Sequence, residues 1–201
     1  MLDRFATALI RPAMDATARV LVRAGVRANT ITVAGFAIGL GAAVLIAIHA
    51  YSMGLVALLV SRIGDALDGA VARQTHTSDA GGFLDIALDF VFYASIPLAF
   101  AIADPATNAL PAAALLAAFV GTSSSFLAFA VLAAKRGLTS LAYPDKSFYF
   151  LGGLTEATET LLCFTAMCLW PQHFAPLAWV FTALCAVTTA TRIGWGWRTF
   201  S

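Results

Sequence analysis

Long apolar stretches with few charges between them are the feature of this sequence that most constrains its fold. Of the 201 residues, 60% are hydrophobic and only 11% are charged, about half the charged fraction of a soluble domain. Six apolar segments are each near the length of about 20 residues that spans a bilayer: 31–49, 52–73, 82–103, 110–134, 147–170 and 174–193. We therefore expect an all-α integral membrane protein with six transmembrane helices, embedded in a lipid bilayer.

The N-terminal region has a different pattern. Apolar residues such as Leu9, Ala16 and Val20 recur at helical spacing, and the arginines between them fall mostly on other faces. This pattern predicts an amphipathic helix lying in the membrane surface, with Pro12 as a break or restart. A helix that packs on its own protein is the alternative. We expect a juxtamembrane helix at 1–28 and a six-helix transmembrane domain at 29–201.

Lysine and arginine indicate the orientation of the spans. They cluster before the first span, end the second at Arg73, lie between the fourth and fifth, and recur near the C-terminus. The other three connections contain neither residue type. Because cytoplasmic loops are enriched in these residues, we expect both termini, and the loops after the second and fourth spans, in the cytoplasm. The basic residues form no stripe, so nucleic acid is not an expected partner.

Four aspartates stand where the second and third spans meet on the cytoplasmic side. Asp65 and Asp68 are three residues apart, and Asp85 and Asp89 are four apart, so each pair lies on one helical face. A short turn joins the two spans, and two antiparallel helices can bring these faces together. Each carboxylate inside a membrane helix costs about 2.5–3.5 kcal/mol when nothing compensates it.

A bound divalent cation is the simplest compensation. Arg62 and Arg73 are the only cations inside or ending these spans, too few to pair with every aspartate. Oxygen ligands without cysteine favour Mg²⁺, Mn²⁺ or Ca²⁺ over zinc, and a salt-bridge cluster is the structural alternative. Gly69 and Gly81 let a ligand approach the backbone, and Arg73 suits a phosphate. We expect a site for a phosphorylated substrate at the membrane surface.

The stretch from Asp65 to Asp89 reads D-x2-D-G-x2-A-R-x7-G-x3-D-x3-D, and it resembles the signature of the CDP-alcohol phosphatidyltransferases. Six spans behind an amphipathic helix are also similar to that family, so the likeness covers essentially the whole chain. The resemblance implies that Asp65, Asp68 and Asp85 hold Mg²⁺ or Mn²⁺ on the diphosphate of a CDP-linked donor. It implies that Asp89 is a further ligand or the general base.

The resemblance also implies a pocket for the cytidine and phosphates, lined by Gly69, Ala72, Arg73 and Gly81. The opening of the first span, from Ala28 to Thr32, resembles the P-N-x-[IL]-T of the family, with Ala28 in place of proline. Asn29 and Thr32 would then contact the nucleotide. The alternative is that they are plain helix N-caps.

Transfer of a phosphatidyl group to an alcohol, with release of CMP, is the activity that the resemblance implies. CDP-diacylglycerol is the common donor in the family, and a homodimer in a bacterial-type inner membrane is the common assembly. One alternative is an aminoalcohol phosphotransferase that uses CDP-choline or CDP-ethanolamine with a diacylglycerol acceptor. Another is a cation transporter, although transporters usually carry their carboxylates near mid-membrane and in related halves.

The acceptor is predicted from the only two glutamates, Glu156 and Glu159, which we expect two to three turns into the fifth span. Intramembrane carboxylates are functional candidates, and a buried structural pair is the alternative. Their stretch resembles the E-R-x-E-R of members that use inositol phosphate, but Ala157 and Thr160 replace both arginines. A neutral polyol or an amino alcohol therefore fits better, although lysine and arginine nearby could bind one anionic group. The predicted acceptor residues are Lys146, Glu156, Glu159 and Arg192.

Overall fold

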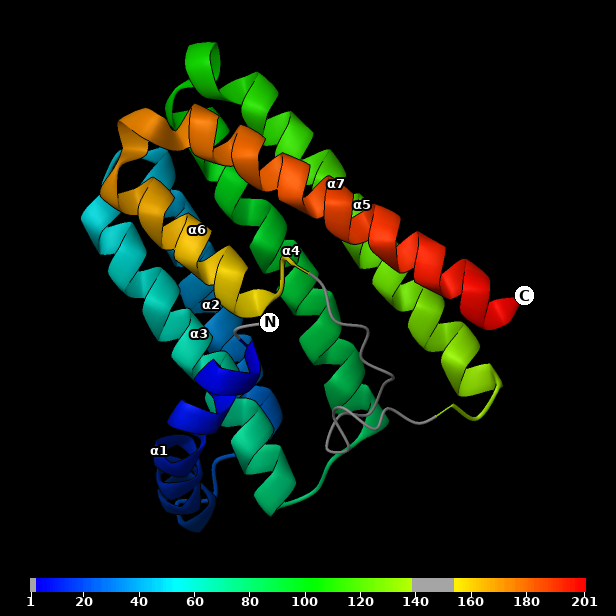
Figure 1. The fold of residues 1–201 in the computed structure, drawn as a ribbon. Coiled ribbons are helices and arrows are strands. Elements are labelled where there is room, and N and C mark those ends of the chain that lie inside the picture. Colours follow the sequence, from blue (N-terminus) through cyan, green and yellow to red (C-terminus); the bar gives the residue numbers. More distant parts are fainter. Residues whose placement is uncertain (1–2, 139–153) are drawn as a thin grey trace.

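The computed structural model describes residues 3–138 and 154–201, and every regular element in these ranges is helical (Figure 1). The helices are α1 (Asp3–Arg23), α2 (Ala28–Ala47), α3 (Tyr51–Gln74), α4 (Asp79–Ala103), α5 (Pro105–Lys135), α6 (Ala157–Leu169) and α7 (Phe174–Phe200), with a 3-10 turn at Pro171–His173. The prediction of an all-α protein is confirmed.

Four segments are long and apolar enough to cross a membrane: α2, α4, α5 and the stretch Pro171–Phe200 that contains α7. With its 24 residues, α3 is about 36 Å long, but Arg62, Asp65, Asp68 and Arg73 crowd its second half. Only 13 residues belong to α6, and part of the predicted fifth span lies outside the described residues. The chain is an integral membrane protein, and its number of six transmembrane spans remains a prediction.

Helix ends coincide with residues that favour them. Ser78 caps α4, because its hydroxyl accepts from the backbone N–H of Gly81 at 3.1 Å. Asp104 caps α5 in the same way, accepting from the N–H of Thr107 at 3.3 Å. The Ser78 cap starts α4 at Asp79, three residues before the predicted span, so the connection from α3 is shorter than expected.

The expected break at Pro12 is wrong, because α1 runs through this residue from Asp3 to Arg23. Proline removes one hydrogen bond from a helix interior, and packing against another helix can outweigh that loss. Here Ala18 is buried against Ala70 and Val71 of α3. Other apolar side chains of α1 are exposed, among them Leu9 and Val20.

Glycines let α2 and α3 approach each other closely. A Cβ on Gly64 would lie 3.4 Å from the Cα of Gly35, and a Cβ on Gly39 would lie 2.6 Å from the ring of Phe92 in α4. A Cβ on Gly64 would just touch α2, whereas a side chain on Gly39 would require the Phe92 ring to move. The crossing therefore fixes the part of α3 that carries Asp65, one residue after Gly64.

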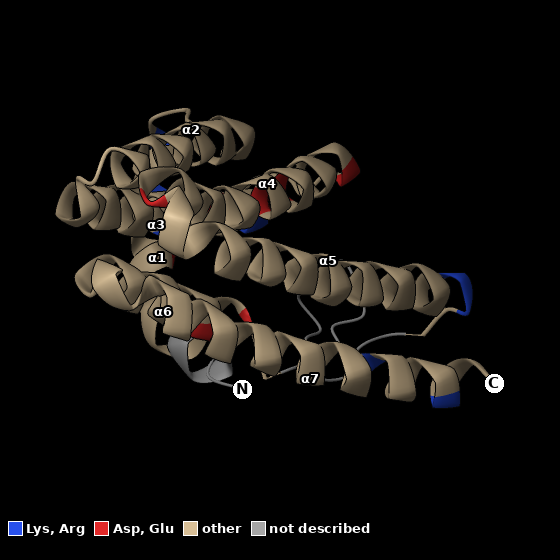
Figure 2. Cartoon of the chain, turned by 90° about the horizontal axis from the view of Figure 1, so that it is seen from above, with Lys and Arg blue, Asp and Glu red and all other residues tan. Residues whose placement is uncertain are grey.

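The helices form two groups with α4 between them (Figure 1). One group contains α2, α3 and α6, and in the other α5 and α7 run side by side. Packing joins the groups through rings such as Phe100 of α4 and Phe174 of α7, which stack 4.6 Å apart. Seen from above, α5 and α7 carry their basic residues toward their C-terminal ends (Figure 2). Because α4 contacts both groups, its side chains can belong to two sites.

Candidate active site

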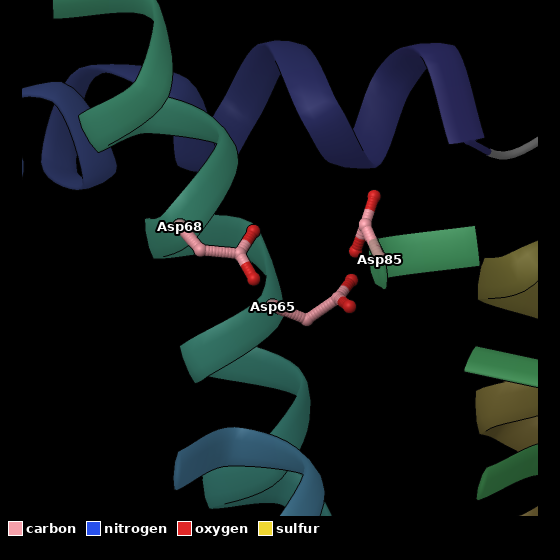
Figure 3. A group of neighbouring side chains, drawn as sticks. All are labelled: Asp65, Asp68 and Asp85. Carbon is pink, nitrogen blue, oxygen red and sulfur yellow. The ribbon is translucent and has the colours of Figure 1, made fainter. Parts of the chain in front are cut away.

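Three carboxylates converge between α3 and α4 (Figure 3). Asp65 and Asp68 project from α3, and Asp85 projects toward them from α4. One carboxylate oxygen of each residue lies within 4.8 Å of the others. We call these three residues the acidic triad. The two acidic faces thus meet, as the helical spacing of the aspartates predicts.

The acidic triad fits a divalent cation. Asp68 is 6% exposed, and its Oδ2 is buried with no hydrogen-bond partner among the described residues. A buried carboxylate oxygen without a partner is costly. Hard oxygen ligands from several carboxylates are what Mg²⁺ and Mn²⁺ prefer. The three carboxylate ligands and the unpartnered Oδ2 of Asp68 together indicate that the acidic triad is where the chain would hold such an ion.

Asp89 lies one turn beyond Asp85 on α4, and it has a different environment. Nη1 of Arg62 donates to Oδ1 of Asp89 at 2.7 Å and lies 3.5 Å from Oδ1 of Asp65. The guanidinium carbon lies 3.8 Å from the centre of the Phe92 ring. From the sequence, Arg62 is only one of the two cations inside or ending these spans. No local signal could assign its partner, because 27 positions separate Arg62 from Asp89.

The predicted nucleotide residues of α2 lie beside this site, but they are not helix caps. The N-cap of α2 is Arg27, which makes no side-chain cap bond, so the N-cap interpretation of Asn29 and Thr32 is wrong. Thr32 lines a small cleft together with Arg62, Asp65, Asp85 and Asp89, which we call the acidic cleft.

Two glycines among the nucleotide candidates each lie beside another candidate residue. A Cβ on Gly81 would lie 3.1 Å from Oδ1 of Asn29, so the starts of α2 and α4 meet there. A Cβ on Gly69 would lie 3.3 Å from Nη1 of Arg73. Arg73 is exposed at the end of α3, after the half-buried Ala72. Its only ion pair in the described ranges is a long one of 3.8 Å to Asp15 of α1, and a weak surface pair of this kind does not prevent phosphate binding.

A larger cavity of about 220 Å³ adjoins the acidic cleft, and Asp89 lines both. Residues of α4, α5, α6, α7 and the segment before α6 line this space, which we call the polar cavity. Aromatic and other apolar side chains make up much of its lining, and the name refers to its polar members: Asp89, Thr122, Ser123, Thr155, Glu156, Thr160 and Arg192. No other residue of the described chain lines both spaces. Asp89 therefore stands at their junction.

The two glutamates are not two to three turns into a helix, and that prediction is wrong. Glu156 is the N-cap of α6, and its backbone N–H donates to Oε2 of Glu159 at 3.2 Å in a capping box. Negative charge is favoured at a helix N-terminus, which explains why the helix starts there. Glu156 is 7% exposed and lines the polar cavity, whereas Glu159 is not among its lining residues. Lys146 lies outside the described residues.

Arg192, the last of the predicted acceptor residues, is buried in α7. It is 8% exposed, and its Nη1 donates to the carbonyl of Thr122 in α5 at 3.1 Å. Its Nε has no hydrogen-bond partner among the described residues. Glu156 and Arg192 thus place one negative and one positive group in the same polar cavity.

Comparison with known proteins agrees with this geometry. The sequence model of the CDP-alcohol phosphatidyltransferase family matches residues 26–193. The inner membrane protein YnjF of Escherichia coli (strain K12) is 51% identical over 199 residues, which cover 99% of this chain and 97% of that protein.

Two crystal structures of Mycobacterium tuberculosis phosphatidylinositol phosphate synthase (PgsA1) have a similar fold. The structure with CDP-DAG bound has a TM-score of 0.72 at 21% identity and covers 92% of this chain and 93% of its own. The structure in complex with manganese and citrate has a TM-score of 0.71 at 20% identity, with coverage of 92% and 88%. At these identities the likeness concerns the fold.

Proposed function

The chain belongs to the CDP-alcohol phosphatidyltransferase family, and from that premise we propose that it transfers a phosphatidyl group from CDP-diacylglycerol to a small alcohol and releases CMP. It is an enzyme of this class. The observation that carries the proposal is the position of Asp89, which lines both the acidic cleft and the polar cavity. A donor at the first and an acceptor at the second would meet at this carboxylate.

Asp65, Asp68 and Asp85 are the residues that would hold Mg²⁺ or Mn²⁺ on the donor diphosphate. The ion, when bound, neutralises the charge that develops on the leaving CMP. Asn29, Thr32, Gly69, Ala72, Arg73 and Gly81 would surround the nucleotide and its phosphates. The neighbouring Asn29 and Gly81, together with the exposed Arg73, support this assignment.

Asp89 is the proposed general base. It removes the proton of the acceptor hydroxyl, and the oxygen then forms a bond to the phosphorus that carries diacylglycerol. The bond between this phosphorus and the bridging oxygen breaks, and CMP leaves with the electron pair. A fourth metal ligand is the alternative role of Asp89 that the sequence leaves open. Its position between the acidic cleft and the polar cavity supports the base role.

The polar cavity is the proposed acceptor site. A space of about 220 Å³ has the size of a small molecule rather than of a diacylglycerol, which supports CDP-diacylglycerol as donor over a reaction in which diacylglycerol is the acceptor. Glu156 and Arg192 are the charged residues that would orient the alcohol. Glu159 would act through its capping bond to Glu156.

We further propose that the protein has six transmembrane spans: the four long apolar segments, α3, and the segment that ends in α6. We also propose that α1 lies in the membrane surface. Exposed apolar residues on α1, among them Leu9 and Val20, support its contact with lipid. Basic residues at the ends of α3, α5 and α7 support a cytoplasmic site and cytoplasmic termini in a bacterial-type inner membrane. A homodimer is proposed from the family resemblance alone.

Purified protein incubated with CDP-diacylglycerol, Mn²⁺ and a panel of alcohols tests the proposal through the release of CMP. We expect CMP only when donor, metal and one class of alcohol are all present, and none after addition of EDTA. Parallel reactions with CDP-choline or CDP-ethanolamine and diacylglycerol test the alternative donor. Absence of CMP in every combination, together with absence of donor binding by calorimetry, would contradict the proposed function.

A further inference from the structure

The polar cavity contains charged groups of both signs, and they come from different helices. Among its described lining residues, the charged ones are Asp89 of α4, Glu156 at the start of α6 and Arg192 of α7. Asp89 already has a cationic partner, because Nη1 of Arg62 donates to it at 2.7 Å. Glu156 and Arg192 are therefore one acid and one base that face the same space of about 220 Å³.

Contacts with α5 hold the guanidinium of Arg192 in place. Its Nη1 donates to the carbonyl of Thr122 at 3.1 Å, and its guanidinium carbon lies 5.7 Å from the centre of the Phe126 ring. The residue is 8% exposed, and its Nε is buried with no hydrogen-bond partner among the described residues. A buried guanidinium with a donor left over is costly. An anionic group on a ligand would compensate it, and a planar carboxylate matches the guanidinium fork.

The main chain of Glu156 is fixed at the N-terminus of α6. Its N–H donates to Oε2 of Glu159 at 3.2 Å, and its carbonyl accepts from the hydroxyl of Thr160 at 2.8 Å. The residue is 7% exposed, and negative charge is favoured at a helix N-terminus. A carboxylate has about four lone-pair sites, so it can accept from an ammonium in addition to the bonds that it makes within the protein.

These charges discriminate between classes of acceptor. A neutral polyol would displace water from Glu156 and Arg192 without pairing either charge, and an amino alcohol would pair only the glutamate. A phosphate ester would pair with Arg192 but bring its own negative charge close to Glu156 and Asp89. A molecule with an ammonium, a carboxylate and a hydroxyl offers each of the three charged lining residues a group that it can bind.

We infer that the acceptor is a zwitterionic hydroxy amino acid, whose carboxylate binds Arg192 and whose ammonium binds Glu156. The inference rests on the proposed function, because it names the class of alcohol that occupies the polar cavity. With both charged groups held, the hydroxyl faces Asp89, which takes its proton. The hydroxyl oxygen bonds to the phosphorus, the bond to the bridging oxygen breaks, and CMP leaves with the electron pair. The product is a phospholipid whose head group carries an ammonium and a carboxylate.

Acceptors that differ by one group test this assignment through CMP release with CDP-diacylglycerol and Mn²⁺. L-Serine carries all three groups, ethanolamine lacks the carboxylate, and 3-hydroxypropionate lacks the ammonium. Glycerol represents a neutral polyol, and glycerol 3-phosphate represents an anionic acceptor. We expect kcat/KM for L-serine to exceed that for ethanolamine or 3-hydroxypropionate by about 100-fold, because each of these lacks one charged contact in a buried site. Glycerol and glycerol 3-phosphate should be poorer still.

Two variants assign each charge of the acceptor to one residue. Arg192→Met should raise KM about tenfold for L-serine and 3-hydroxypropionate and leave that for ethanolamine unchanged. Glu156→Gln should raise KM about tenfold for L-serine and ethanolamine and leave that for 3-hydroxypropionate unchanged. Arg198→Met, exposed in the last turn of α7, is the matched control and should equal the wild type with every acceptor. If Arg192→Met does not fold, Arg192→Lys keeps the charge without the fork and should show a smaller rise for the same two acceptors.

Calorimetry with L-serine in the presence of CMP and Mn²⁺ gives a second measurement that does not need turnover. We expect binding about tenfold weaker in both variants than in the wild type. A KM that changes equally for all acceptors would indicate a purely structural role of the two residues and overturn the inference. So would a kcat/KM for any other acceptor in the set at or above that for L-serine, although CMP release would then still support the proposed function.

Failure of the proposed function has a different signature. In that case the wild-type protein would bind no CDP-diacylglycerol and release no CMP with any acceptor. Weaker L-serine binding in both variants would even then support recognition of a zwitterion in the polar cavity. Absence of L-serine binding, or equal binding in the wild type and both variants, would reject it.

Discussion

The acidic triad and the polar cavity meet at Asp89, but they are built in opposite ways. The triad comes from two consecutive helices, within positions 65–85 of the chain. The polar cavity draws on four helices, with lining residues from Asp89 to Arg192. Helical spacing over a short connection is therefore enough to assemble the first site, whereas the second exists only after distant helices have packed.

The two regions also differ in how their charges are compensated. The triad brings three carboxylates together, and Nη1 of Arg62 lies 3.5 Å from Oδ1 of Asp65. The polar cavity contains Glu156 and Arg192, one charge of each sign, besides Asp89. Buried charges need partners. Three like charges in one place fit a bound cation, whereas the polar cavity offers a small molecule one group of each sign.

Asp89→Asn should have the largest effect, because it changes the residue that both regions share. We expect kcat to fall by about 10³-fold, the typical contribution of a general base, while the affinity for the donor stays close to wild type. CMP release and calorimetry with CDP-diacylglycerol measure the two quantities. A variant with near-normal kcat would show that another group removes the proton.

Asp68→Asn should affect the triad alone. The amide keeps the size of the side chain but removes the charge that a metal ligand supplies, so we expect metal-dependent donor binding to weaken by about 100-fold. Calorimetry with and without EDTA separates the metal-dependent part. Asp79→Asn, at an exposed position in the first turn of α4, is the matched control. Equal donor affinities in the two variants would argue against a ligand role for Asp68.

Arg192→Met should affect the polar cavity alone. We expect the KM for the alcohol to rise about tenfold, because the alcohol would lose roughly one hydrogen bond to a charged group. Binding of Mn²⁺ and of the donor should not change. The exposed Arg198→Met provides the control for removal of a positive charge from α7. If the KM for the donor rose instead, Arg192 would belong with the nucleotide site.

Gly39→Ala tests the support beneath the cleft and should have the smallest effect. The added Cβ meets Phe92 at 2.6 Å, and overpacking of this kind costs about 1–3 kcal/mol. Gly41→Ala, where no atom lies within 4 Å of the new Cβ, should instead stabilise the helix by up to about 1 kcal/mol. Thermal unfolding in detergent compares the two, and equal midpoints would mean that the α2–α4 contact contributes little.

The sequence predicts which residues lie together where one helix, or two joined helices, decides the geometry. Spacings of three and four residues predict which aspartates share a face, and the structure brings Asp65, Asp68 and Asp85 together. It failed where a neighbouring helix decides. The break at Pro12 is absent, and α1 packs on α3. Glu156 is the N-cap of α6 and Glu159 lies in its first turn, not two to three turns into a helix.

The sequence by itself determined the helical membrane architecture, the family and the triad, because hydrophobicity, helical period and motif spacing are local properties of the chain. Only the tertiary structure decided that Asp89 contacts Arg62 rather than joining the triad, and that Arg192 is buried in one cavity with Glu156. The physical reason is that a charged side chain is compensated by whatever group packing places within a few ångströms of it. That partner can be tens of residues away in the sequence.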